Sequence, residues 1–178
     1  MMSDTIELVE RVRRRLNEHE NPCQIAGPAP ETAISAAEEA LGVTFPPSYR
    51  TFLRTFGGIA IPAHLGVVHD FVGVTGLGTE AVTGAGSADA ATNDVVHRTL
   101  EARAQRKLAE HLVVVGMGAE FQEWFCLDIR SPTPAGEYPV LLFDARDNAL
   151  DQQFYDDFGQ MLAEVMGFVA DSLDHPLD

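Results

Sequence analysis

The sequence predicts an α+β domain in which a central, mostly antiparallel sheet is flanked by N-terminal and C-terminal helices. Apolar residues recur at three- and four-residue steps near both ends of the chain, which is typical of amphipathic helices. Short runs rich in β-branched residues occupy the middle and favour strands. The chain has 178 residues, 46% of them hydrophobic and 22% charged, so it suits one globular domain over residues 1–178.

The first helix is predicted over residues 4–20. Asp4 followed by Glu7 can satisfy the unpaired N–H groups at its start. After the helix, three prolines and one glycine between residues 21 and 31 indicate a loop. The apolar side chains of the helix follow at four-residue spacing and define its expected buried face: Leu8, Val12 and Leu16.

Two further helices are predicted before the strands begin. The second covers residues 31–41 and ends at Gly42, which can adopt the left-handed conformation common after a helix. The third begins at Pro47, where the missing N–H costs nothing because the first N–H groups of a helix have no partner. It ends before Gly57 and Gly58, and its apolar stripe has four members: Tyr49, Phe52, Leu53 and Phe56.

The middle of the chain combines strands with one helix. Strands are predicted over residues 67–74 and 111–115, with a helix over residues 94–110 between them. Two more strands, 121–129 and 140–143, are joined by a proline-rich loop, so we expect them to pair as an antiparallel hairpin. The expected buried face of the helix follows four-residue steps: Val96, Leu100, Ala104 and Leu108.

The last helix is predicted over residues 152–169. The acidic stretch from Asp144 to Asp151 is similar to a calcium loop but lacks that loop's central Gly and final Glu, so we interpret it as a strand-to-helix turn. Asp156 and Asp157 fall in the first helical turn, where negative charge is favoured. The helix has a strong apolar face: Phe154, Phe158, Met161, Leu162, Val165 and Val169.

The negative charge of the chain constrains what it binds. Lys and Arg total 12 and Asp and Glu total 27, which gives a net charge of −15 at pH 7. Nucleic acid is a poor partner for such a surface, because binding phosphates requires basic groups that release counterions. We therefore expect a basic protein partner and no nucleic acid, although the charge alone is also compatible with an ordinary acidic protein.

The sequence contains no recognisable catalytic, metal-binding or nucleotide-binding motif. His64, His69 and Asp70 lie close together without zinc-ligand spacing, and no nucleophile elbow or phosphate-binding loop occurs. Cys126 lies in a strand-like run, where a cysteine is usually a small buried hydrophobe. We therefore predict no enzyme activity, no metal and no cofactor. The alternative is an enzyme with a site around one of four residues: His64, His69, His111 or Cys126.

Several features favour a cytoplasmic location. No apolar run approaches the roughly 18 residues of a membrane span, so we expect no membrane partner. The first apolar residues are interspersed with acids, unlike a secretory signal. Two cysteines, Cys23 and Cys126, are too few for a disulfide framework. The sequence leaves the oligomeric state open.

The segment from Ile34 to Gly58, ISAAEEALGVTFPPSYRTFLRTFGG, resembles the opening of the SMI1/KNR4-like family of the SUKH superfamily. The similar pattern in that family is a helix with Ile and Glu, Leu-Gly, an apolar residue with Pro, a Tyr, a Phe-Leu pair and a closing Asn-Gly or Gly-Gly. Here Phe56 stands where the family often has the Asn. The matching positions are Ile34, Glu38, Leu41, Gly42, Phe45, Pro46, Tyr49, Phe52, Leu53, Gly57 and Gly58. Weaker similarities follow in order and extend the resemblance over about residues 31–169: 112–116, 125–128, 140–144 and 158–162.

This resemblance implies an α+β fold and a protein-interaction module whose motif residues fill a core rather than catalyse. Many bacterial members are immunity proteins that bind and neutralise a cognate toxin, often a nuclease, and eukaryotic members are linked to cell-wall regulation. A nuclease presents basic groups to phosphates, and an acidic inhibitor can occupy them. A regulatory or scaffolding protein with an endogenous partner is the alternative. Residues 79–106 form a longer insertion than is typical of the family, so the family's partner contacts cannot be transferred.

We expect partner-binding residues near strand ends and at the start of the last helix, where acids lie close to the single tryptophan. Tryptophan is favoured at binding hot spots, although a core position fits Trp124 equally well. Two of the acids, Asp156 and Asp157, could serve the helix terminus alone. The candidates are Glu120, Glu123, Trp124, Asp144, Asp147, Asp156 and Asp157.

Overall fold

A computed structural model describes residues 2–18, 23–74, 94–118 and 120–175. Its helices are α1 (Met2–Glu18), α2 (Glu31–Leu41), α3 (Pro47–Thr55), α5 (Val95–Arg106) and α6 (Phe158–Asp174). Its strands are β1 (Gln24–Ile25), β2 (Ile59–Ala60), β3 (Asp70–Phe71), β4 (Leu112–Gly118), β5 (Glu123–Asp128), β6 (Val140–Asp144) and β7 (Ala149–Tyr155). None of the helices in these ranges is long and apolar enough to cross a membrane.

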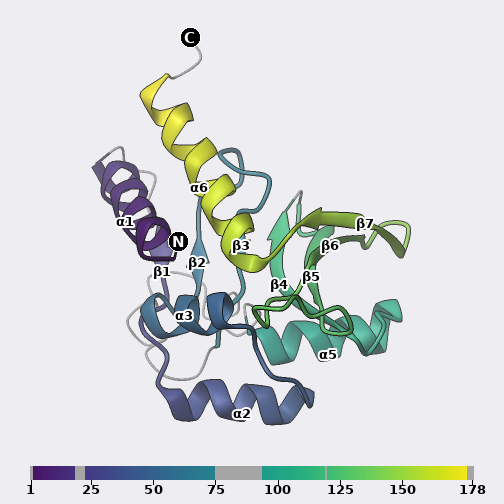
Figure 1. Cartoon of the computed structure of the whole chain (residues 1–178). Coiled ribbons are helices and arrows are strands. Elements are labelled where there is room, and N and C mark those ends of the chain that lie inside the picture. Colours follow the sequence, from purple (N-terminus) through teal and green to yellow (C-terminus); the bar gives the residue numbers. More distant parts are fainter. Residues whose placement is uncertain (1, 19–22, 75–93, 119, 176–178) are drawn as a thin grey trace.

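The strands form one sheet in which spatial order follows chain order from β1 to β7 and every neighbouring pair is antiparallel. Figure 1 shows the short strands β1–β3 beside α1 and α6, and the longer strands β4–β7 extending away from them. This arrangement confirms the α+β class and the predicted hairpin of β5 and β6. The strand predicted over residues 67–74 is shorter than expected, and β1 and β2 are too short to produce a periodic signal in the sequence.

A cluster of aromatic side chains closes the core between α3, α6 and β3. The ring of Phe158 lies 4.9 Å from that of Tyr49 and 5.0 Å from that of Phe52. Phe71 of β3 lies within 6.4 Å of the Phe158 ring, and all four rings are fully buried. The Tyr49 hydroxyl donates to the Val72 carbonyl at 2.7 Å, which satisfies the one polar atom in this cluster. These contacts confirm the predicted stripe of α3.

Helix α5 packs against β4, but it uses a different face from the predicted one. The side chains of Val95, Thr99 and Ala102 are buried, whereas Leu100 is exposed. Four-residue steps drift around a helix of 3.6 residues per turn, so Val96, Leu100 and Ala104 of the predicted row leave the buried face. Its fourth member, Leu108, is buried but follows the end of the helix. Thr99 also has a specific role, because its hydroxyl accepts a hydrogen bond from the Val114 amide in β4 at 3.1 Å.

The C-terminal region corrects two further predictions. Residues 149–155 pair with β6, so the segment predicted as the start of the last helix forms β7 instead. Within the acidic stretch, residues 145–148 form the turn of the β6–β7 hairpin rather than a strand-to-helix turn, and Asp151 lies in β7. Asp157 then caps α6 by accepting a hydrogen bond from the Gln160 amide at 2.8 Å, which sets the helix start at Phe158.

Helix α1 lies along α6 (Figure 1) and buries Val12 and Leu16 as predicted, together with Val9 instead of Leu8. Arg15 forms an ion pair with Asp174 and donates to the Leu173 carbonyl at 3.0 Å, which joins the ends of the two helices. The predicted end of this first helix at residues 19 and 20, and most of the predicted insertion, lie outside the described residues.

Candidate protein-interaction surface

Five of the seven predicted partner-binding residues gather where the β4–β5 and β6–β7 hairpins turn. Glu123 begins β5 and pairs in register with Asp144, which ends β6. The next pair is Trp124 and Phe143, whose rings stack at 5.5 Å with an interplanar angle of 24°. We call this region the acidic end of the sheet and define it by six residues: Glu120, Phe121, Glu123, Trp124, Asp144 and Asp147.

Trp124 is half-buried and held in one orientation. Its indole N–H donates to the Phe121 carbonyl at 2.8 Å, and one face of the ring is covered by Phe143. The side chain therefore belongs neither to the closed core nor to a freely rotating surface position. A fixed aromatic ring with a partly open face is a suitable anchor for a protein partner, because little rotamer entropy remains to be lost on binding.

Arg146 organises the acids of this surface. Its guanidinium donates to Asp144 Oδ2 at 2.9 Å and to Oδ1 at 3.1 Å, and it also reaches Glu123 Oε1 at 3.5 Å. The Arg146 hydrogen bonds lower the pKa of Asp144, so this carboxylate stays ionised. Glu123 and Asp144 are thus held by an internal cation, while Glu120 and Asp147 are exposed at the tips of the two hairpins.

The tip of the β4–β5 hairpin has an unusual backbone. Glu120 and Phe121 both have positive φ angles, +59° and +62°, in the left-handed region that side chains other than Gly, Asn and Asp seldom adopt. Phe121 is 47% exposed, and its ring packs edge-on against buried His69 at 4.7 Å. His69 Nδ1 lies 3.1 Å from Asp70 Oδ1, while His69 Nε2 is buried without a hydrogen-bond partner. The Phe121 side chain at the hairpin tip therefore packs on the buried His69 ring.

The structure separates the remaining two candidates from this surface. Asp156 and Asp157 follow the other end of β7, and a seven-residue strand spans roughly 20 Å. Asp157 is the N-cap of α6, and the Asp156 amide donates to Gln160 Oε1 at 2.5 Å. The Asp157 carboxylate therefore serves the helix start, whereas the Asp156 carboxylate accepts a hydrogen bond from the Gln153 side-chain amide at 3.0 Å.

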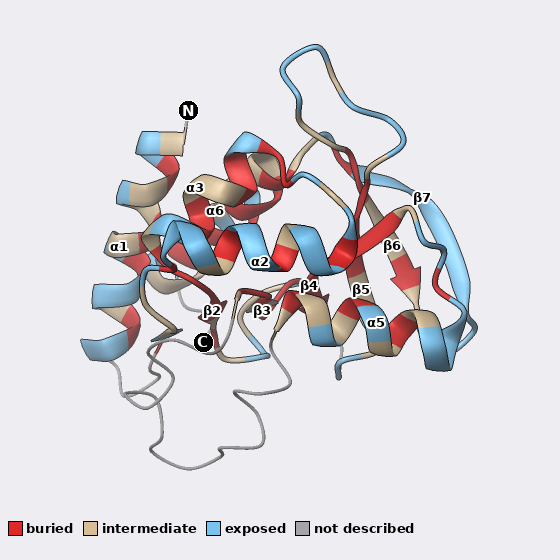
Figure 2. Ribbon diagram, turned by 90° about the horizontal axis from the view of Figure 1, so that it is seen from below, coloured by how far each residue is buried: buried red, intermediate tan, exposed pale blue. Residues whose placement is uncertain are grey.

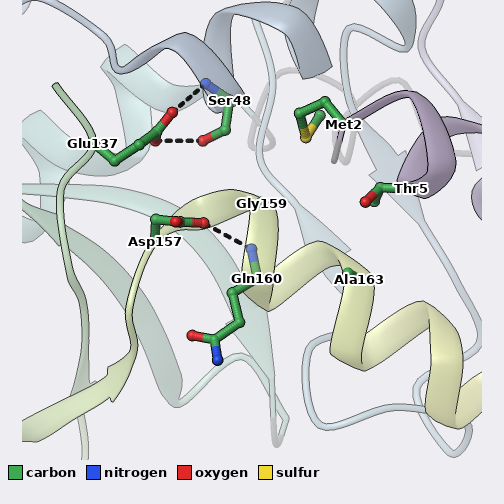
Figure 3. A pocket seen from close by; sticks show the side chains of 8 residues that line it. All are labelled: Met2, Thr5, Ser48, Glu137, Asp157, Gly159, Gln160 and Ala163. Atoms are coloured by element: carbon green, nitrogen blue, oxygen red, sulfur yellow. Dashed lines mark hydrogen bonds between the residues drawn. The ribbon is translucent and has the colours of Figure 1, made fainter. Parts of the chain in front are cut away.

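A cleft of about 320 Å³ lies between α1, α3 and the start of α6 (Figure 3). On one side, Glu137 accepts hydrogen bonds from the Ser48 amide at 2.8 Å and the Ser48 hydroxyl at 2.6 Å. On the other, Asp157 is held by the Gln160 amide. Each carboxylate compensates for unpaired N–H groups at a helix N-terminus, Glu137 for α3 and Asp157 for α6. The cleft therefore joins structural caps rather than reactive groups.

Three of the residues named as an alternative enzyme site, His69, His111 and Cys126, are wholly or partly buried. Burial raises the pKa of the Cys126 thiol far above its usual range and that of Cys23 to about 11, so neither is a thiolate at neutral pH. His111 Nε2 is buried without a hydrogen-bond partner. No group of three His, Cys, Asp or Glu side chains within the described residues could hold a metal ion.

Several residues that shape this surface were missed in the sequence. The sequence does not predict the role of Arg146, because its contact with Asp144 depends on the turn between β6 and β7. Phe143 and Phe121 were assigned only to strands. The sequence does not predict the exposure of Leu150 and Phe154 either, because it places Leu150 in a turn and Phe154 in the last helix, whereas both lie in β7. The run Ala-Leu-Asp-Gln-Gln-Phe-Tyr mixes polar and apolar residues, and this is the signal that could have indicated an exposed strand.

Comparison with known proteins identifies one family. The model of the SMI1 / KNR4 family (SUKH-1) matches residues 28–164 of this chain. A search of curated proteins found no match. The matched range includes α2, α3, α5, the strands from β2 to β7 and the first part of α6. It leaves out α1, β1 and the C-terminal part of α6.

Proposed function

We propose that this chain, which belongs to the SMI1 / KNR4 family (SUKH-1), is an interaction module that binds a basic protein partner through the acidic end of the sheet. The observation that carries the proposal is the fixed, half-open Trp124 ring set among exposed acids at one end of the sheet. The partner we favour is a cognate toxin that the protein neutralises, for example a nuclease, which has to expose basic groups to its substrate.

The charged and the aromatic side chains of this surface would contribute to binding in different ways. Glu120 and Asp147 are exposed at the hairpin tips, where they can attract a cationic surface over several ångströms and speed its approach. Trp124 and Phe121 lie at the same end of the sheet and offer apolar area that can be desolvated on contact. We therefore expect the acids to control the association rate and the aromatic rings to control the lifetime of the complex.

A regulatory or scaffolding protein that binds an endogenous partner would use the same surface. The two possibilities differ in the partner, because a toxin loses its activity in the complex whereas a regulatory partner need not. An enzyme with an unrecognised site is the less favoured alternative, since the buried thiols and the absence of a metal cluster in the described residues offer it no support.

The test begins with the tagged full-length chain, captured from its own host in low salt and then in moderate salt, with co-eluting proteins identified by mass spectrometry. Binding kinetics with the captured basic protein then compare the wild type with a Glu120→Lys/Asp147→Lys double variant. We expect the association rate to fall roughly tenfold at low salt, with a smaller difference at high salt. Glu164→Lys/Asp171→Lys, at two exposed positions of α6, reverses the same number of charges and is the control.

The aromatic contribution has its own variant. Trp124→Ala should raise the dissociation rate by about 30-fold, the effect of losing about 2 kcal/mol at a hot spot. Phe168→Ala removes another exposed ring, on α6, and should leave the rate unchanged. A partner whose association ignores both salt and the double charge reversal would contradict binding through the acidic end of the sheet.

A further inference from the structure

Strand β7 forms an open edge of the sheet. It is last in the strand order, and in the described residues only β6 pairs with it. Six of its seven residues are exposed, and Figure 2 shows this exposure along most of the strand. A strand at a sheet edge presents backbone N–H and C=O groups that another strand can use. Within the described sheet, β7 is a much longer edge than the two-residue β1 at the opposite side.

The pairing of β7 with β6 is irregular in its middle. Ala149, Leu150, Gln153 and Tyr155 have register partners on β6, whereas the residues between them fall at two register shifts. The Gln152 amide donates at 2.8 Å to Oδ1 of the neighbouring Asp151 side chain. This is a local, exposed hydrogen bond, so the carbonyl of an incoming strand could replace the carboxylate as acceptor at little cost.

Two rows of apolar side chains cross the sheet and end at this edge. On one face, Trp124 stacks on Phe143, and Phe143 is the register partner of Leu150. On the other face, the Phe125 ring lies 5.7 Å from the ring of Phe154. Leu150 is 46% exposed and Phe154 47%. An added strand would extend both rows, because its alternating side chains would cover Leu150 on one face and Phe154 on the other.

The charge around β7 selects the kind of strand that can pair. Five aspartates lie between residues 144 and 157, with Arg146 as the one base, and Arg146 is already engaged by Asp144 and Glu123. A second copy of this chain would place like charges side by side, which is destabilising across paired strands. A segment rich in lysine or arginine would instead gain opposite-charge contacts, so the acids exclude self-pairing and favour a basic occupant.

We propose that β7 accepts an extended basic segment of the protein partner as an added strand. This deepens the proposed function and rests on it, since it names how part of a basic partner would be held. Backbone hydrogen bonds to β7 would provide affinity that does not depend on the sequence of the bound segment. The side chains of that segment would be selected by Leu150, Phe154 and the flanking aspartates.

The test uses a defined probe and the full-length ¹⁵N-labelled protein. The probe is a seven-residue peptide of alternating lysine and valine with blocked ends. Its control carries N-methyl groups on two adjacent central residues, which keeps the charge but blocks backbone pairing along both edges of the peptide. We expect the unmodified peptide to bind about tenfold more tightly and to slow hydrogen exchange of β7 amides.

Protein variants complete the experiment. Asp151→Lys should weaken binding of the unmodified peptide about tenfold, while the charge-matched Asp171→Lys, roughly 20 Å along α6 from the helix start, should not. Gln152→Pro removes one edge N–H and should abolish the difference between the two peptides; thermal unfolding confirms that the variant is folded.

Two results would overturn the strand-addition proposal. Equal affinity for the two peptides would mean that charge alone drives binding, and failure of both peptides to bind at low salt would mean that the edge does not accept a complementary strand. Neither result bears on the acidic end of the sheet, whose test is the association rate of the natural basic partner with the Glu120→Lys/Asp147→Lys variant.

Discussion

At the scale of single residues, glycines decide how closely the chain can pack against itself. A Cβ atom on Gly73 would lie 1.5 Å from the Gly57 carbonyl oxygen, and one on Gly57 would lie 1.8 Å from the Gly27 carbonyl oxygen. Beside this contact, the Val74 amide donates to the Gly57 carbonyl at 3.1 Å. The backbones of three loops therefore meet directly, which only residues without a side chain permit.

We expect Gly73→Ala to lower the unfolding free energy by about 1–3 kcal/mol or more. The new Cβ would clash with the Gly57 carbonyl oxygen, a backbone atom that can shift only if the loop around it shifts too. The matched control is Gly167→Ala in α6, where a new Cβ meets nothing within 4 Å. That change should stabilise the helix by up to about 1 kcal/mol. Urea unfolding monitored by circular dichroism measures both, and equal effects of the two substitutions would contradict the packing argument.

The candidate surface shows which residue contacts the sequence could predict. Glu123, Trp124 and Asp144 come together because the predicted antiparallel pairing of two strands places the start of one beside the end of the other. The role of Arg146 depends on the conformation of the β6–β7 hairpin turn, where the sequence predicts a strand-to-helix turn, so it could not be predicted. The left-handed backbone at Phe121 had no signal either, since neither Gly nor Asn occupies that position.

At the scale of elements, the boundary between β7 and α6 is the main difference from the sequence prediction. Phe154 continues the four-residue spacing of Phe158 and Leu162, so apolar periodicity alone extends the helix backwards. Residues 149–155 form a strand instead, because they pair with β6 along its free side. The capping residue Asp157 was recognised as favourable near a helix start, but its position as N-cap depends on where the strand ends.

Helix α1 lies outside the part of the chain matched by the family model, yet it packs against α6. We expect Leu16→Ala to lower the unfolding free energy by about 2–5 kcal/mol, because the Leu16 side chain is fully buried. Leu100→Ala, at an exposed position of α5, should change it by no more than about 0.5 kcal/mol. Thermal unfolding distinguishes the two, and a small effect at Leu16 would mean that α1 is dispensable for the fold.

At the scale of the whole molecule, a net charge of −15 acts against the compact state through mutual repulsion. Raising NaCl from 10 to 150 mM shortens the Debye length from about 30 Å to about 8 Å, so we expect the unfolding free energy to increase. Asp171→Lys lowers the net negative charge by two and should reduce this salt response. A stability that is constant or falls with salt would show that ion pairs such as Arg146–Asp144 outweigh the repulsion.

The order of the strands also has a consequence for how the protein is made on the ribosome. Because each strand pairs with the one before it, the sheet can grow in step with synthesis, without waiting for distant partners. The aromatic core cannot close in this way, since Phe158 of the last helix covers Tyr49 and Phe52 from the first third of the chain. A nascent chain halted before α6 would hold a paired sheet with an uncovered apolar face, which is the form that chaperones would meet.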